Sequence, residues 1–395
     1  MNVLEPVSAN EHRGFDEDAL RIVRTETLSV TAPTIRAHKL SNTEISNKSI
    51  IVVRVTLGNG AVGYGEGSTL GGPRWAEESP ESIRAAVDKY LAPAIFGQPA
   101  NRFEMLGQAM GKAATRNTAA RAAIDSALYD AVGRSLDLPA SQLLGGRVHD
   151  GFEVIWALAS GDVDQEIEEA RGKFAAREHR RFKVKIGLSE PRAEIQRLAR
   201  LAEALPDCEI IVDVNQAWTV AQCYRWIPAL EELGIALIEQ PVASGDRRNL
   251  ARITERSRVP VMIDEGAFSV GEVAEAGADG AGTVLSLKLV KSGGLMELKR
   301  AAGIASAHGM ELYGGCLLES GIGAAAHLAV FSTLPKLHWG TEHFGPKILT
   351  RDLVSGGLNF GDFRVECPTG PGLGVIVDED HMLELADGGW RSAAS

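Results

Sequence analysis

Three acidic residues, Asp213, Glu239 and Asp264, each end a short apolar run of the sequence. The intervals between them are 239−213 = 26 and 264−239 = 25 residues. A strand–helix unit of a (β/α) barrel takes roughly 25–30 residues, so the spacing predicts successive strands that deliver one carboxylate each to the same face. Three converging carboxylates are a donor set for a hard cation such as Mg²⁺ or Mn²⁺.

Lysines occupy comparable positions in two other apolar runs. Lys183 and Lys185 lie two residues apart, so they should point to the same side of a strand. Repulsion between two neighbouring ammonium groups should lower the pKa of at least one of them and allow it to exchange a proton near neutral pH. Lys288 belongs to a later run and should lie across the barrel mouth. A metal flanked by lysines suits proton transfer at a carbon next to a carboxylate, through an enolate.

Two further polar residues are candidates by their position. Asn215 lies two residues after Asp213 and should share its face of the strand. Glu319 follows the Gly314-Gly315 pair after the seventh apolar run. It is either a site residue or a cap of the following helix.

The elements that would position these residues form a regular alternation from residue 154 onward. Eight apolar runs recur with helical patterns between most of them, which favours an α/β fold with a modified TIM barrel of the (β/α)7β type over an open sheet. The predicted strands are residues 154–158, 182–186, 210–214, 236–240, 261–265, 284–289, 311–315 and 337–342.

The region before the barrel has α+β character. It contains predicted strands at residues 22–31, 49–57 and 61–66, then helices at residues 81–91, 103–113 and 118–136, the last of which is rich in alanine. The C-terminal segment has strand and turn patterns again and should return to the N-terminal region. We therefore predict a polar tail (1–20), an α+β capping and lid domain (21–148), the barrel (149–347) and a segment that completes the cap (348–395).

Composition excludes several functional classes. The chain has 395 residues and a net charge of −11 without a basic stripe, which argues against nucleic-acid binding. Its apolar runs are strand-sized, so no membrane span is expected, and no secretory signal is evident. The cysteines lack Cys-x-x-Cys spacing and are interpreted as reduced thiols of a cytoplasmic protein. His308, His327, His338 and His343 lack ligand spacing and are interpreted as structural.

Five barrel segments resemble the muconate lactonizing subgroup of the enolase superfamily, a known example of lysine or histidine bases used with Mg²⁺. They are residues 182–187 (FKVKIG), 213–216 (DVNQ), 238–241 (IEQP), 264–265 (DE) and 286–291 (SLKLVK). Residues 33–40 (PTIRAHKL) look like the first lid loop of muconate cycloisomerases, and residues 144–147, 156–162, 312–315 and 339–346 are similar to that family too. The resemblance begins near residue 22 and continues to the C-terminus. The lid and the 339–346 segment narrow it to muconate or chloromuconate cycloisomerases.

The resemblance implies a reaction and partners. The reaction is the reversible closure of cis,cis-muconate to muconolactone in aromatic (catechol/β-ketoadipate) catabolism, and the substrate is a small dicarboxylate. A homo-oligomer, an octamer, is implied as well. The implied roles are Mn²⁺ or Mg²⁺ binding by Asp213, Glu239 and Asp264, proton transfer by Lys185 beside Lys183, charge stabilisation by Lys288, and proton donation by Glu319.

The second lid segment, residues 69–75, departs from the family pattern. Trp75 stands where the family carries Tyr, which replaces an O–H donor with an N–H donor. We expect Leu70, Trp75 and Asn215 to contact the substrate and to bear on the choice between muconate and chlorinated muconates. The alternatives are a dipeptide epimerase or o-succinylbenzoate synthase, which the lid disfavours, and a catalytically silent binding homologue, which the intact lysines and carboxylates disfavour.

Overall fold

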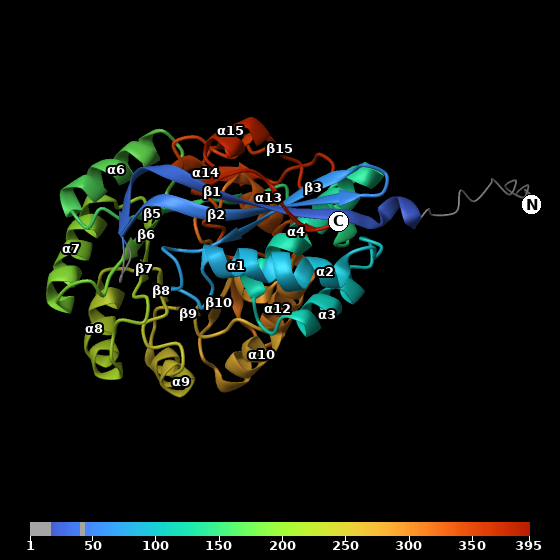
Figure 1. Ribbon diagram of the computed structural model, residues 1–395. Coiled ribbons are helices and arrows are strands. Elements are labelled where there is room, and N and C mark those ends of the chain that lie inside the picture. Colours follow the sequence, from blue (N-terminus) through green and yellow to red (C-terminus); the bar gives the residue numbers. More distant parts are fainter. Residues whose placement is uncertain (1–16, 40–43) are drawn as a thin grey trace, which may run out of the picture.

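The computed structural model describes residues 17–39 and 44–395, so most of the predicted polar tail lies outside the described residues. The last residues of that tail form a short 3-10 helix, Asp18–Leu20, whose Leu20 is buried. Figure 1 shows an antiparallel sheet with helices packed beside a ring of strands and outer helices. No helix in the described part of the chain is long and apolar enough to cross a membrane.

The barrel prediction is confirmed. Within the described residues, seven parallel strands pair in the order β11-β10-β9-β8-β7-β6-β5. A small apolar core of Ile155, Ile211, Leu237, Met262, Val284 and Tyr313 fills the space inside these strands. The strands are β5 (Ile155–Leu158), β6 (Arg181–Lys185), β7 (Glu209–Asp213), β8 (Leu237–Glu239), β9 (Val261–Ile263), β10 (Val284–Leu287) and β11 (Glu311–Gly314). The helices around them are α6 (Val163–Ala175), α7 (Pro191–Ala204), α8 (Val220–Glu232), α9 (Arg247–Arg256), α10 (Val270–Asp279), α11 (Leu289–Ser292), α12 (Leu295–Ala307), α13 (Gly321–Phe331) and α14 (Gly345–Ile348).

The predicted eighth strand, residues 337–342, is not a continuous strand. Only Thr341 pairs, in parallel bridges to Val154 on one side and Gly314 on the other. Gly340 has a φ of +72°, and a Cβ there would lie 2.6 Å from the carbonyl oxygen of Glu153, so the chain turns where the pattern predicted extension. The turn still closes the barrel between β5 and β11.

The capping sheet is longer than its sequence pattern indicated. Its strands pair in the order β16-β1-β2-β3. The predicted strands at residues 22–31 and 49–57 extend toward each other as β1 (Ile22–Lys39) and β2 (Glu44–Leu57), followed by β3 (Val62–Ser68). The helices of this region are α1 (Pro80–Ala86), the π-helix η2 (Val87–Leu91), α2 (Ala92–Ile95), α3 (Phe103–Ala113), α4 (Thr118–Leu136) and α5 (Ala140–Leu143).

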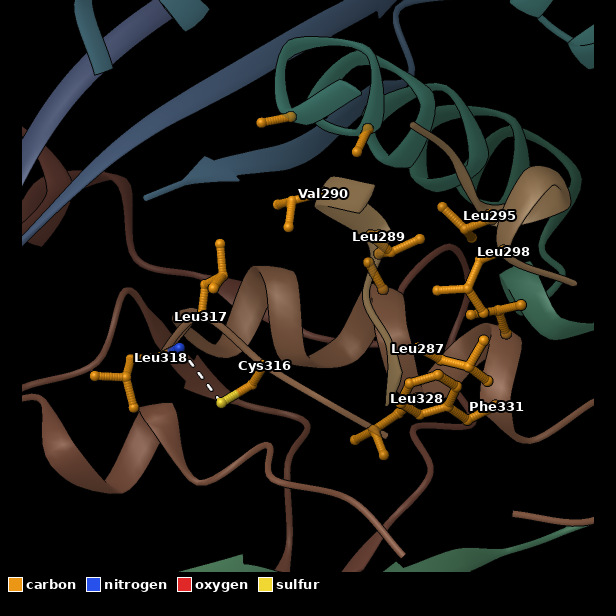
Figure 2. Close-up of a cluster of buried hydrophobic side chains, with 14 of the residues drawn as sticks. Leu287, Leu289, Val290, Leu295, Leu298, Cys316, Leu317, Leu318, Leu328 and Phe331 are labelled. Atoms are coloured by element: carbon orange, nitrogen blue, oxygen red, sulfur yellow. Dashed lines mark hydrogen bonds between the residues drawn. The ribbon is translucent and has the colours of Figure 1, made fainter. Parts of the chain in front are cut away.

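Close packing explains the alanine content of α4. A Cβ on Gly63 would lie 2.2 Å from the carbonyl oxygen of Ala127, and one on Gly65 would lie 1.9 Å from that of Ala123. Glycine on β3 and alanine on α4 therefore let the two backbones approach, as protein interiors require for dense packing. Below α4, Val290 and Leu295 belong to the apolar cluster that continues into the barrel (Figure 2).

The C-terminal segment returns to the cap, as the fold prediction states. β16 (Arg391–Ala394) pairs with β1 and completes the capping sheet. β14 (Arg364–Glu366) joins β13 (Phe360–Gly361) and β4 (Gly151–Glu153). β12 (Val354–Gly356) pairs with β15 (Ile376–Val377), and α15 (Glu379–Glu384) follows β15 along the chain. The boundaries at residues 20, 148 and 347 stay predictions.

Asp125 of α4 makes stability depend on pH. Burial raises its pKa to about 7, although its carboxylate accepts a hydrogen bond from the Leu295 backbone N–H at 2.7 Å. Because the unfolded value is about 3.9, the stabilisation from a protonated Asp125 is complete below about pH 4 and is lost as pH rises toward about 7. Relative to Asp125→Asn, the wild type should lose roughly 3 kcal/mol of unfolding free energy across that window. Denaturant unfolding of both proteins at pH 5 and pH 7.5 measures this; parallel pH dependences would contradict it.

Candidate active site

Charged side chains gather where successive barrel strands end. Lys185, Asp213 and Glu239 are the last residues of β6, β7 and β8, and they are neighbours in the sheet register. Asp264 directly follows β9 and Lys288 directly follows β10. The carboxyl ends of parallel strands meet at one face of a barrel, and that face is where barrel enzymes place their chemistry.

A cavity lies at this face, between the barrel and the cap. It is lined by Lys183, Lys185 and Lys288, by Asp213, Asn215 and Glu239, and by the predicted lid residues Leu70 and Trp75. Asp264 and Glu319 are not among the described residues that line it. Asp264 nevertheless contacts the cavity wall, because its carboxylate pairs with the ammonium of Lys288.

Each of these lysines is paired with a carboxylate from another segment of the barrel. Lys185 contacts Asp213, and its Nζ also donates to Asn215 Oδ1 at 3.1 Å. Lys183 contacts Glu239 and lies 2.8 Å from Glu342 Oε1. The site therefore alternates positive and negative groups instead of separating them.

Of the two neighbouring lysines, Lys183 is not one whose pKa is lowered. Burial disfavours its ammonium form, but the carboxylates of Glu239 and Glu342 outweigh burial and hold the pKa of Lys183 well above its ordinary value. The predicted lowering does not occur at Lys183, because the ammonium contacts two carboxylates that its own strand does not supply. Lys183 stays charged and is suited to hold charge, not to exchange a proton near neutral pH.

The three strand-end carboxylates differ in how well their charges are balanced. Burial acts against ionisation in all three, but the lysines beside Asp213 and Asp264 lower the pKa of both aspartates. Burial and the nearby charge of Asp213 raise the pKa of Glu239 well above its ordinary value. Oε2 of Glu239 forms an ion pair with the Lys183 ammonium, but Oε1 has no hydrogen-bond partner among the residues that the structure describes. The described residues therefore balance the negative charge of the buried Glu239 carboxylate only in part.

This donor set fits a divalent cation. Three carboxylates supply hard oxygen ligands, and Oε1 of Glu239 has no partner among the described residues that would compete with a metal ion. Added positive charge there would favour the ionised form of Glu239. Asp213, Glu239 and Asp264 are the residues that would hold the ion.

A second group with metal-ligand chemistry lies nearby. Among the described residues, Glu319, His327 and His343 place potential ligand atoms within 4.8 Å of one another. Both ring nitrogens of His327 are already engaged, with the Gly323 carbonyl oxygen at 2.8 Å and the Leu289 backbone N–H at 3.0 Å. This group can therefore offer a metal two free ligands at most. His327 has a structural role, because its ring bonds the backbone on both sides.

Two glutamates near the cavity, Glu319 and Glu342, differ in whether their side chains line it. Glu319 is buried behind the cavity wall, where its Oε2 accepts the Leu317 backbone N–H at 2.8 Å. Glu342, which the sequence did not single out, lines the cavity and pairs with Lys183. The only signal for Glu342 was its place inside the 339–346 segment. Glu319 does not line the cavity among the described residues, whereas Cys316 and Leu318 do, and its predicted role as proton donor stays a prediction.

We expect substitution of Glu342 and substitution of Glu319 to lower kcat by different amounts. Glu342→Gln should lower kcat about tenfold or more, because Lys183 loses one of its two close carboxylates at the reacting face. Glu319→Gln should lower kcat much less, because Glu319 accepts only a backbone N–H there. Steady-state kinetics of both variants check this; a larger loss of kcat for Glu319→Gln would reverse the assignment.

The cap supplies the upper wall of the cavity. Lys288 lies 4.4 Å from the ring centroid of Trp75, a cation–π distance, and Trp75 packs on Phe268 at 5.4 Å. Leu70 is buried beside it. His38 at the end of β1 also lines the cavity and was missed, although it lies in the first lid motif; burial lowers its pKa to about 3, so it is neutral.

Comparisons with known proteins agree with this geometry. Residues 165–381 match the family described as enolase C-terminal domain-like, and residues 23–145 match the mandelate racemase / muconate lactonizing enzyme N-terminal domain. Muconate cycloisomerase 1 of Pseudomonas putida is 42% identical over 356 residues, which cover 90% of this chain and 95% of that protein. A chloromuconate cycloisomerase of Cupriavidus necator is 40% identical over 364 residues, 92% of this chain and 98% of the relative. The crystal structure of muconate lactonizing enzyme from Pseudomonas fluorescens, complexed with muconolactone, superposes with a TM-score of 0.92 at 39% identity and covers 93% of this chain and 100% of that one.

Proposed function

This chain belongs to the mandelate racemase / muconate lactonizing enzyme family of the enolase superfamily, and from that premise we propose that it is a muconate cycloisomerase. The observation that carries the proposal is one cavity lined by lysines from opposite sides of the barrel and by carboxylates of the strands between them. Both the muconate and the chloromuconate relatives support this isomerase activity over an epimerase or a synthase.

The reaction places a different demand on each side of the cavity. One substrate carboxylate oxygen adds to an alkene carbon, so a C–O bond forms and an electron pair moves to give the enolate of the other carboxylate. Lys185 then delivers a proton to the α-carbon, a C–H bond forms, and the neutral lysine regains its proton from solvent. Lys288 faces this charge from the other side, while Lys183 is held charged by Glu239 and Glu342.

We propose Mn²⁺ or Mg²⁺ as the ion held by Asp213, Glu239 and Asp264. When bound, the ion would supply positive charge beside the substrate carboxylate that becomes the enolate. The protein's own part is to exclude water with Leu70 and Trp75 and to keep the lysines on both sides of the substrate.

The test is a spectrophotometric assay of diene absorbance with cis,cis-muconate. Activity should require Mn²⁺ or Mg²⁺, disappear with EDTA and return when excess metal is added. Absence of any EDTA-sensitive loss of muconate would refute the function. A parallel assay with 3-chloromuconate measures the substrate preference. We expect Leu70 and Trp75, which line the cavity from the cap, to influence this preference.

We also propose a cytoplasmic, octameric protein. The four cysteines are free in the structure, which supports a reducing environment. The octamer is supported by the family resemblance, and light scattering on the purified chain measures the mass of the assembly.

A further inference from the structure

Lys48 of β2 is a buried cation outside the proposed catalytic groups. Its side chain is 1% exposed, and it does not line the substrate cavity among the described residues. Its Nζ donates hydrogen bonds to two backbone carbonyl oxygens, those of Thr69 at 2.5 Å and Leu317. A lysine is rarely buried without partners, and here the partners are backbone groups from two distant segments.

The two segments form adjoining walls of the cavity. Thr69 begins the lid segment, residues 69–75, whose Leu70 and Trp75 line the cavity from the cap. Leu317 lies in the turn segment, residues 316–319, whose Cys316 and Leu318 line it from the barrel (Figure 2). One ammonium group thus connects both walls.

The turn segment needs such support because its backbone is strained. Leu318 has a φ of +59°, in the left-handed region that a leucine rarely adopts. Such conformations persist where surrounding contacts over-determine them. Those contacts include the Lys48 bond to Leu317 O, the Leu317 N–H bond to Glu319, and the Leu318 N–H contact with Cys316 Sγ at 3.5 Å.

The surrounding charges offset part of the cost of burying this ammonium. Burial lowers the pKa of Lys48 from its ordinary value, and the carboxylates of Glu319 and Glu66 act in the opposite direction. Glu66 of β3 also accepts hydrogen bonds from the Ser320 and Gly323 backbone N–H groups, at 3.1 and 3.0 Å, at the start of α13. Cap side chains therefore fix the backbone within and just after the turn segment.

We propose that Lys48 is a positioning residue that ties the lid segment to the turn segment and so sets the two walls of the substrate cavity relative to each other. In this proposal Glu319 has a structural role as well. It accepts the Leu317 N–H of the same turn, and its carboxylate stabilises the charge of Lys48. The part of the proposal that concerns substrate affinity rests on the proposed muconate cycloisomerase function, whereas the part that concerns the lid does not.

The first test is limited proteolysis of the metal-loaded, full-length protein. Arg74 is an exposed trypsin site inside the lid segment. Lys48→Met keeps an unbranched side chain of nearly the same length but removes the donors. It should increase the rate of cleavage after Arg74 about tenfold, which corresponds to about 1.4 kcal/mol of lost protection. The matched control is Lys299→Met, which also removes a lysine-to-carbonyl bond, to Leu144 O at 2.5 Å, away from the lid. The control should leave cleavage after Arg74 unchanged.

The second test is kinetic. Lys48→Met should raise KM for cis,cis-muconate about tenfold and change kcat less than about threefold, because the groups that touch the substrate are intact. A purely structural role would lower active enzyme and kcat without changing KM. Unchanged cleavage after Arg74, or a fall in kcat alone, would overturn the proposal.

If Lys48→Met does not fold, Lys48→Gln, which retains an uncharged N–H donor, must show the same direction of change in lid cleavage. If the wild type does not turn over muconate, the proposed function fails, and lid cleavage alone decides the role of Lys48.

Discussion

Replacing Lys185 with alanine is expected to lower kcat by ~10²–10⁴-fold, the range attributed to a positioned general acid or base. Lys185 is the lysine that ends β6 and contacts both Asp213 and Asn215. Its loss removes the group that exchanges the carbon proton, while Lys183 stays 3.9 Å from Asp213 and keeps that carboxylate paired. Turnover of cis,cis-muconate under saturating metal and substrate gives the result.

The control for this prediction is Lys173→Ala. Lys173 also belongs to a lysine–carboxylate pair, with Glu178 at 2.6 Å, but it lies on α6 outside the cavity. It should leave kcat within about twofold of wild type, as expected for a mostly surface ion pair. Near-wild-type turnover by a folded Lys185→Ala protein would remove Lys185 from the chemistry.

Replacing Glu239 with glutamine should weaken binding of the divalent ion by more than ~100-fold. Loss of a group that only hydrogen-bonds a metal ligand costs ~10–100-fold in affinity, and loss of a ligand itself should cost more. Glutamine preserves the volume and removes the charge of a carboxylate whose Oε1 has no hydrogen-bond donor among the described residues. Lys183 retains Glu342 at 2.8 Å, so the substitution does not leave it an unpaired buried cation. Activity should fall at low Mn²⁺ and recover in part as Mn²⁺ is raised.

Calorimetric titration with Mn²⁺ measures the affinity directly, without relying on turnover. The matched control is Glu153→Gln at the opposite end of the barrel, where the carboxylate pairs with Arg181 at 3.2 Å and also contacts Arg180. Equal Mn²⁺ affinity of wild type and Glu239→Gln would show that Glu239 is not a ligand.

Local sequence patterns were sufficient for the elements that carry the site. The helices predicted at residues 103–113 and 118–136 match α3 and α4, and Asp213 and Glu239 end β7 and β8. These predictions succeed because helix period, strand alternation and the position of a charge at the end of an apolar run are properties of neighbouring residues. The even spacing then implies one face for all three carboxylates, because each barrel unit repeats the same geometry.

The eighth strand shows where that reasoning ends. Residues 337–342 have the composition of a strand, but Gly340 turns with a positive φ and packs so close to the backbone of Glu153, nearly two hundred residues earlier in the chain, that a side chain there would clash. A pattern confined to six residues contains no information about that approach.

The sequence by itself determined a metal-type carboxylate set and lysines at the ends of barrel strands. Only the tertiary structure decided which glutamate faces the cavity, why Lys183 stays charged, and what Lys48 connects. Glu342 rather than Glu319 faces the cavity because barrel closure at Thr341 carries Glu342 to the mouth. Charge and strain at these positions depend on groups brought together from the cap and distant strands, and burial makes their electrostatic interactions strong.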